Sequence, residues 1–178
     1  MVYQWLAPLI SQTTEPMQDS PKRIQVLGGL LRHLGTFDMH QFAGRLVLQK
    51  TVYLLQEMGF FLGYRFNWYI YGPYSPELAR HGFDLAKSSK SIPPYQFANE
   101  NNESQFQRFV AFLGAKKTDP IWLEAVASIH FQKKLRPSRA KDEIIQQVVA
   151  KQPYFSLTIC KDAWKVLEDA NLLVEDNT

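Results

Sequence analysis

The sequence is poor in the features that mark several large classes of protein. Its 178 residues include a single cysteine, Cys160, so no disulfide can form within the chain, and this favours a reducing compartment. No run reaches the ~20 consecutive apolar residues of a membrane-spanning helix. The apolar start, residues 1–10, lacks the basic residues that precede the core of a signal peptide. We therefore expect a cytoplasmic protein without a membrane partner.

Signatures of catalysis and of cofactor binding are equally scarce. Gly28-Gly29 lies inside a helical pattern with no strand before it, so it is not a phosphate-binding loop. The four histidines have no cysteine or carboxylate at a spacing suited to a metal. Cys160 is interpreted as a small buried residue rather than a nucleophile. We expect no cofactor, no metal and no enzymatic activity, although a catalytic cluster built from distant residues would leave no trace in the sequence.

What the chain does contain is material for one helical core. Hydrophobic residues make up 46% of it, which is enough for a packed interior. Apolar residues recur at helical spacing over most of its length, and three proline-initiated or serine-initiated helix starts stand out, at Ser75-Pro76, Asp119-Pro120 and Ser156. Ser20-Pro21 and Ser138 are further candidate starts. The expected fold is mainly α.

One segment departs from the helical period. Phe66, Trp68 and Ile70 alternate with polar or tyrosine positions, which predicts a strand over about residues 65–71. Gly72-Pro73 is the expected turn after it. Residues 95–98 are a candidate partner strand, so that the fold would contain a small antiparallel β element.

The predicted organisation is an arm followed by one domain. Residues 1–21 form an N-terminal arm and linker, rich in Ser, Thr, Gln and Pro from residue 11 onwards. Residues 22–178 form a single mostly helical domain. Within it we distinguish a core over about 22–115 and C-terminal helices over about 119–172.

The strongest predicted helix runs from Arg45 to Met58. Val47, Leu48, Thr51, Leu54 and Leu55 share one face at a period of 3.6 residues, and Gly59 follows where a terminating glycine belongs. The opposite face carries polar residues without being strongly charged: Arg45, Gln49, Tyr53 and Gln56. We predict that the first face enters the core and that the second faces outward.

The sequences Leu48-Gln49-Lys50-Thr51-Val52-Tyr53 and Tyr71-Gly72-Pro73-Tyr74-Ser75-Pro76 together resemble the prokaryotic YwgA-like proteins. They are similar, more distantly, to the Panacea (SocA-like) antitoxin domain and to the C-terminal domain of DarG-type antitoxins. The match covers about a quarter of the chain, at the separation between helix and turn that these families share. The resemblance implies a helical domain that binds a protein partner, a toxin or effector in defence or toxin–antitoxin systems.

This resemblance and the residues themselves define a candidate partner-binding face, which we call the motif face. Tyrosines beside a rigid Gly-Pro turn suit recognition, since they offer contact area at a low cost in rotamer entropy. An equal alternative is that the motif only marks the fold, with Gly and Pro shaping the backbone. The residues assigned to the motif face are Gln49, Lys50, Tyr53, Glu57, Tyr69, Tyr71, Tyr74 and Glu77.

A second hypothesis is a regulator that binds nucleic acid. Five basic residues crowd around Pro137 in what we call the basic segment, and such clusters contact phosphates. The net charge of +3 permits this role without demanding it, and a charged helix end with its loop is the simpler interpretation. The basic segment comprises Lys133, Lys134, Arg136, Arg139 and Lys141.

Overall fold

The computed structural model describes residues 21–35, 37–88 and 92–173. The predicted arm, apart from Pro21, and the Ser20 helix start lie outside the described residues. The described chain is a mainly α domain with one small antiparallel β element, as the sequence predicts. Its elements are α2 (Pro21–Leu34), α3 (Phe42–Glu57), β1 (Asn67–Tyr69), β2 (Gly72–Tyr74), α4 (Pro76–Lys87), α5 (Glu100–Leu113), the 3-10 turn η2 (Gly114–Lys116), α6 (Pro120–Leu135), α7 (Lys141–Lys151) and α8 (Leu157–Asp169).

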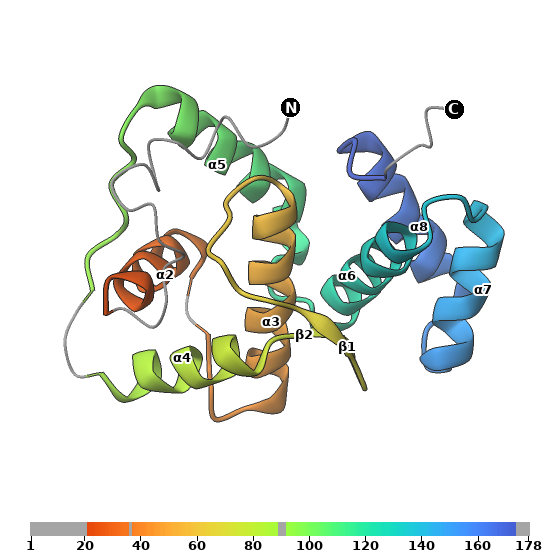
Figure 1. The fold of residues 1–178 in the computed structure, drawn as a ribbon, viewed down its shortest axis with the longest axis horizontal. Coiled ribbons are helices and arrows are strands. Elements are labelled where there is room, and N and C mark those ends of the chain that lie inside the picture. The colour runs from red at the N-terminus through yellow and green to blue at the C-terminus, as the bar shows by residue number, and fades with distance from the viewer. Residues whose placement is uncertain (1–20, 36, 89–91, 174–178) are drawn as a thin grey trace.

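Helix α3 is the centre of the molecule. Figure 1 shows α2, α4 and α5 on one side of it and the group α6, α7 and α8 on the other, with the β1–β2 hairpin between the two groups. Helix α6 packs along α3 and also contacts β2, α7 and α8, so it joins the C-terminal helices to the rest. One continuous hydrophobic core therefore runs through both groups of helices.

The prediction that the polar face of α3 faces outward is wrong. Gln49, Lys50 and Tyr53 are 3%, 2% and 2% exposed, so the middle of the helix is buried on all sides. The cause is the position of α3 between α4, α6 and the hairpin, each of which covers a different side of it. The polar residues of that face are consequently bonded inside the protein.

The predicted strand exists but has a different partner. Asn67–Tyr69 pairs with Gly72–Tyr74 in a tight antiparallel hairpin, in which Trp68 lies opposite Pro73. Residues 95–98 are not a strand; the Tyr95 amide instead donates to the carbonyl of Gly29 on α2. The turn residues are Ile70 and Tyr71, and Gly72-Pro73, predicted as the turn, belong to β2.

Gly72 is placed in that hairpin for a physical reason. Its φ of 81° lies in the left-handed region, where glycine has no steric penalty. A Cβ at this position would lie 2.4 Å from Ser128 Oγ on α6. Any side chain here would therefore push the hairpin away from α6.

Three of the helix starts predicted within the described residues are confirmed, and the one predicted at Ser138 is wrong. Ser75, Asp119 and Ser156 are N-caps whose side chains accept hydrogen bonds from the first turns of α4, α6 and α8, as expected. Ser138 is not a cap. Helix α7 begins at Lys141, where the Glu143 carboxylate accepts a hydrogen bond from the Ala140 amide.

Candidate functional site

Two polar residues of the motif face fasten α3 to β2. The Gln49 amide donates to the Ser75 carbonyl and accepts from the Ser75 amide, both at 2.9 Å. The next residue of the helix, Lys50, donates from Nζ to the Pro73 carbonyl at 2.7 Å. These bonds provide partners for the Pro73 carbonyl of β2 and for the buried Ser75 amide directly after it, while the Ser75 carbonyl also accepts from the Ala79 amide. Gln49 and Lys50 thus fix the hairpin in place, which favours the fold-marking alternative for these two residues.

Burial also changes the ionisation of Lys50. Removal from water lowers its pKa to about 7, although the nearby Glu124 carboxylate opposes the shift. Glu124 itself is 2% exposed, and burial raises its pKa. It accepts hydrogen bonds from Gln152 Nε2 at 2.6 Å and from the Tyr154 hydroxyl.

This polar cluster beneath the hairpin, in which Tyr154 alone is exposed, was not predicted from the sequence. Its members, Lys50, Glu124, Ser128, Gln152 and Tyr154, come from three separate parts of the chain. One signal was present: Glu124 is the single carboxylate in the apolar stretch of residues 120–131. An isolated carboxylate in such a stretch indicates a buried charge that needs partners.

Tyr53 connects α3 to α6 rather than facing solvent. Its hydroxyl lies 2.7 Å from Nδ1 of His130 in a buried hydrogen bond, and its ring packs edge-to-face on Phe66. Burial raises the pKa of Tyr53 and lowers the pKa of His130 to about 4. The imidazole is therefore neutral at pH 7, which suits its place in the core.

The two acidic residues of the motif face form ion pairs within the protein. Glu57 pairs with Lys134 of the basic segment at 2.9 Å. Glu77 receives Nη1 and Nη2 of the buried Arg23, at 2.7 and 3.1 Å, while Arg23 Nε donates to the Leu62 carbonyl. Both carboxylates are thus engaged in the described structure, and the Arg23 pair connects α2 to the start of α4.

The remaining members of the motif face lie outward on the hairpin. Tyr69 is 58% exposed and Tyr71 is 39% exposed, and Ile70 between them is 63% exposed. Tyr74 is half-buried, with its ring 5.5 Å from that of Tyr69. Phe42 at the start of α3 and Phe83 on α4 are also exposed, and the Phe42 ring packs edge-to-face on Tyr71 at 4.9 Å.

These outward side chains border a pocket between α3, the hairpin and α4, which we call the hairpin pocket. It encloses about 280 Å³. Phe42, Tyr71 and Phe83 contribute aromatic walls, and Arg45 and Lys50 are the charged residues among the described residues that line it. Mostly apolar walls with a few convergent polar groups are typical of binding sites.

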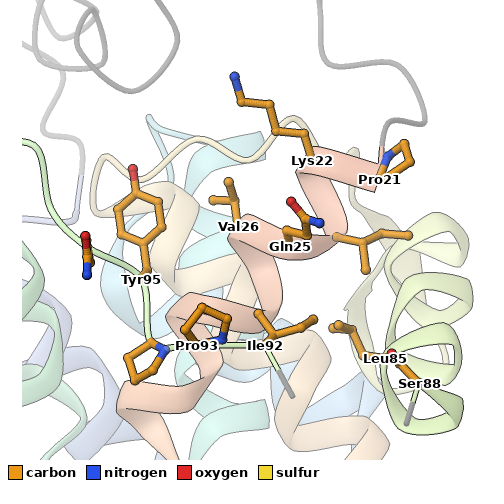
Figure 2. Close-up of a pocket in the computed structure, with 13 residues that line it drawn as sticks. Pro21, Lys22, Gln25, Val26, Leu85, Ser88, Ile92, Pro93 and Tyr95 are labelled. Atoms are coloured by element: carbon orange, nitrogen blue, oxygen red, sulfur yellow. The ribbon is translucent and has the colours of Figure 1, made fainter. Parts of the chain in front are cut away.

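A wider groove lies on another side of the molecule, between α2, the end of α4 and residues 92–96. Figure 2 shows Val26 and Gln25 of α2 facing Ile92, Pro93 and Tyr95 across it. Its volume is about 920 Å³. No residue of the motif face or of the basic segment lines it within the described chain.

The five cations of the basic segment all have partners nearby. Lys133 donates to the carbonyls of Pro137 and Arg139, and Lys134 pairs with Glu57. Arg136 donates to Gln132 and Arg139 to Gln147, at 2.6 and 3.4 Å. The fifth, Lys141, lies over the Trp164 ring at 5.7 Å. The segment is thus the capped end of α6 and its connection to α7, which matches the simpler interpretation; nucleic-acid binding stays an untested prediction.

Other titratable groups hold structural positions. Cys160 is buried, and burial raises the pKa of its thiol to about 11, which agrees with the prediction of an inert residue. His81 is buried and bonded to the Tyr64 hydroxyl at 2.8 Å. Across the residues that the structure describes, no group of three His, Cys, Asp or Glu side chains could hold a metal ion. In the same residues, no helix is both long and apolar enough to cross a membrane.

Comparisons with family models, with curated proteins and with solved structures found no match for this chain. The resemblance to YwgA-like, Panacea and DarG-type domains therefore stays a prediction carried by the two motif sequences.

Proposed function

We propose that this protein is a non-enzymatic protein–protein interaction module. We further propose that it acts as an antitoxin-like or accessory subunit of a prokaryotic defence or toxin–antitoxin system, in the cytoplasm. The family resemblance supports the kind of partner, and the single cysteine supports the compartment. The partner would be a toxin or effector protein, held through the outward part of the motif face.

One observation carries the proposal: exposed apolar side chains gather around one pocket. Tyr69, Ile70 and Tyr71 form the tip of the hairpin, and Phe42 and Phe83 flank it on the neighbouring helices. Aromatic residues clustered on a rigid surface are typical of the energetic centre of protein interfaces. The hairpin is held in place because Lys50 binds its second strand and Gln49 binds Ser75 directly after that strand.

The burial of the motif residues divides them by role. Gln49, Lys50 and Tyr53 would hold the surface in shape, whereas Tyr69 and Tyr71 would touch the partner. A partner that covers the hairpin would bury its exposed aromatic area, each ring contributing about 1.5–3 kcal/mol from apolar burial. Part of this favourable free energy would be offset by the translational and rotational entropy lost on association.

The test compares partner capture by matched variants. We expect the wild-type protein to retain one stoichiometric partner from native extract, and a Tyr69→Ala/Ile70→Ser double variant to lose it, because the contact area at the hairpin tip is gone. The control is Ile121→Ser, since Ile121 is 51% exposed but lies at the start of α6. Capture that survives the double variant, with its fold intact by circular dichroism, would place the interface elsewhere.

A further inference from the structure

The hairpin pocket contains a charged hydrogen-bond donor, the guanidinium of Arg45, in addition to its aromatic walls. Arg45 lines the pocket from the first turns of α3 and is partly exposed. Its Nη1 donates to the carbonyls of Met39 and His40, at 3.1 and 3.0 Å. One corner of the guanidinium is therefore anchored to the backbone, and its carbon lies 5.8 Å from the centre of the Phe42 ring.

The rest of this guanidinium is available to a ligand. Arginine has five N–H donors in a rigid fork, and both bonds that Arg45 makes in the described structure come from Nη1. The Nε and Nη2 edge binds no described acceptor. Such an edge has the geometry that receives a carboxylate through two parallel hydrogen bonds. Anchoring the side chain beforehand also lowers the entropy cost of binding.

The charge and size of the pocket restrict which chemical groups can occupy it. Its ionisable lining residues apart from tyrosine, Arg45 and the buried Lys50, are both basic, and no carboxylate is among the described residues that line it. An anionic group is therefore favoured over a cationic one. A volume of about 280 Å³ is at the lower limit of ligand pockets, which suits one large side chain rather than a nucleotide or a longer segment.

The walls favour an aromatic side chain over an aliphatic one. Phe42, Tyr71 and Phe83 line the pocket, and aromatic rings pair with another ring in offset or edge-to-face arrangements. Gln49 and Lys50 hold the hairpin wall at a fixed distance from α3, so the pocket is formed before any partner arrives. An aromatic group could enter without reorganising the protein.

We propose that the hairpin pocket binds an aromatic side chain adjacent to a carboxylate, presented by the protein partner, with the ring against the wall that Phe42, Tyr71 and Phe83 form and the carboxylate on Arg45. This inference rests on the proposed function and names the part of the partner that the motif face recognises. A chain-terminal aromatic residue, or an aromatic residue beside Asp or Glu, has this chemistry.

The pocket can be tested with small probes before any partner is known. N-acetyl-phenylalanine carries the ring and the carboxylate, and N-acetyl-phenylalaninamide replaces the carboxylate by a neutral amide. We expect the acid to bind with a Kd of about 1 mM and to shift the backbone amide NMR signals of Gly72 and Ala79. The amide should bind about tenfold more weakly, because it loses charge-assisted hydrogen bonds.

Two variants separate the carboxylate contact from the ring contact. Arg45→Gln should bring the two probes to equal affinity, since only the acid uses the guanidinium. Ala79→Leu should abolish binding of both, because Ala79 lines the pocket and the larger side chain fills it. The matched control is Ala86→Leu, on an exposed position of the same helix outside the pocket, and it should bind as the wild type does.

The outcomes distinguish this inference from the proposed function. Equal affinity of the two probes for the wild-type protein, or unchanged binding to Ala79→Leu, would overturn the pocket assignment. If the partner is captured by Ala79→Leu and Arg45→Gln but not by Tyr69→Ala/Ile70→Ser, the interaction function stands and this inference fails. Probe binding that follows the expected pattern supports the pocket even where no partner is captured, and the failure then belongs to the proposed function.

Discussion

The motif face and the basic segment both carry polar residues close together in the sequence, yet the protein uses them differently. On the motif face, Gln49, Lys50 and Tyr53 point inward and bond to the hairpin and to α6, while the hairpin tip exposes aromatic rings. In the basic segment the side chains stay near the surface, and each finds a carbonyl, an amide oxygen, a carboxylate or a ring close by.

The comparison teaches that residue type alone does not identify a recognition surface. A cluster of cations indicates a phosphate-binding patch only if the charges are free to leave their local partners. A helix face rich in polar residues indicates a solvent-facing surface only if no other element covers it. In this protein the surface best suited to recognition is aromatic, and polar residues support it from beneath.

The largest expected effect concerns the inward half of the motif face. Gln49→Leu should lower the free energy of unfolding by about 4 kcal/mol, because the buried Ser75 amide would lose its acceptor and the Ser75 carbonyl would keep only its bond from the Ala79 amide. Urea denaturation followed by circular dichroism measures this. The control is Gln41→Leu, an exposed position before α3 without a side-chain cap bond, which should change stability by less than about 0.5 kcal/mol. A loss below about 1 kcal/mol in Gln49→Leu would mean that water replaces the amide.

A second prediction uses the Tyr53–His130 contact that joins the motif helix to α6. Burial lowers the pKa of His130 from the ordinary histidine value of 6.5 to about 4 in the folded protein. Between these values the unfolded chain binds a proton that the folded protein does not, so stability falls as pH drops from about 6.5 to 4. The full loss is about 3 kcal/mol.

The measurement is the unfolding free energy of wild type and His130→Gln across pH 7 to 4. The variant should show a shallower decline, since one titrating group is gone and glutamine can still bond to the Tyr53 hydroxyl. His40→Gln serves as the control for replacing a histidine at an exposed position. A decline in His130→Gln as steep as that of wild type would contradict the lowered pKa of His130.

The smallest effect is expected in the basic segment. Phosphate contacts there would have to replace existing bonds, including the Lys134–Glu57 pair and the Arg136–Gln132 bond. We therefore expect fluorescently labelled single-stranded and duplex DNA and RNA to bind more weakly than about 0.1 mM at low salt. Tighter binding that falls steeply with salt and disappears in Arg136→Glu/Arg139→Glu would instead establish the nucleic-acid alternative.

The sequence by itself determined the elements whose causes are local. The helical period of α3, the caps at Ser75, Asp119 and Ser156, and the alternation before Ile70 depend on neighbours a few residues away, and they appear in the structure. Cys160 was correctly assigned to the interior from its residue type, since a free cysteine packs as a small apolar side chain.

Only the tertiary structure decided which faces are covered and which polar groups meet. The periodicity of α3 showed one apolar stripe but could not show that the hairpin and α6 cover the other sides, which buries Gln49, Lys50 and Tyr53. The Lys50–Glu124 neighbourhood and the Tyr53–His130 bond join residues that are 74 and 77 positions apart in the sequence and meet only in the folded protein. Such contacts leave no periodic signal, because they follow from how helices pack rather than from how each one forms.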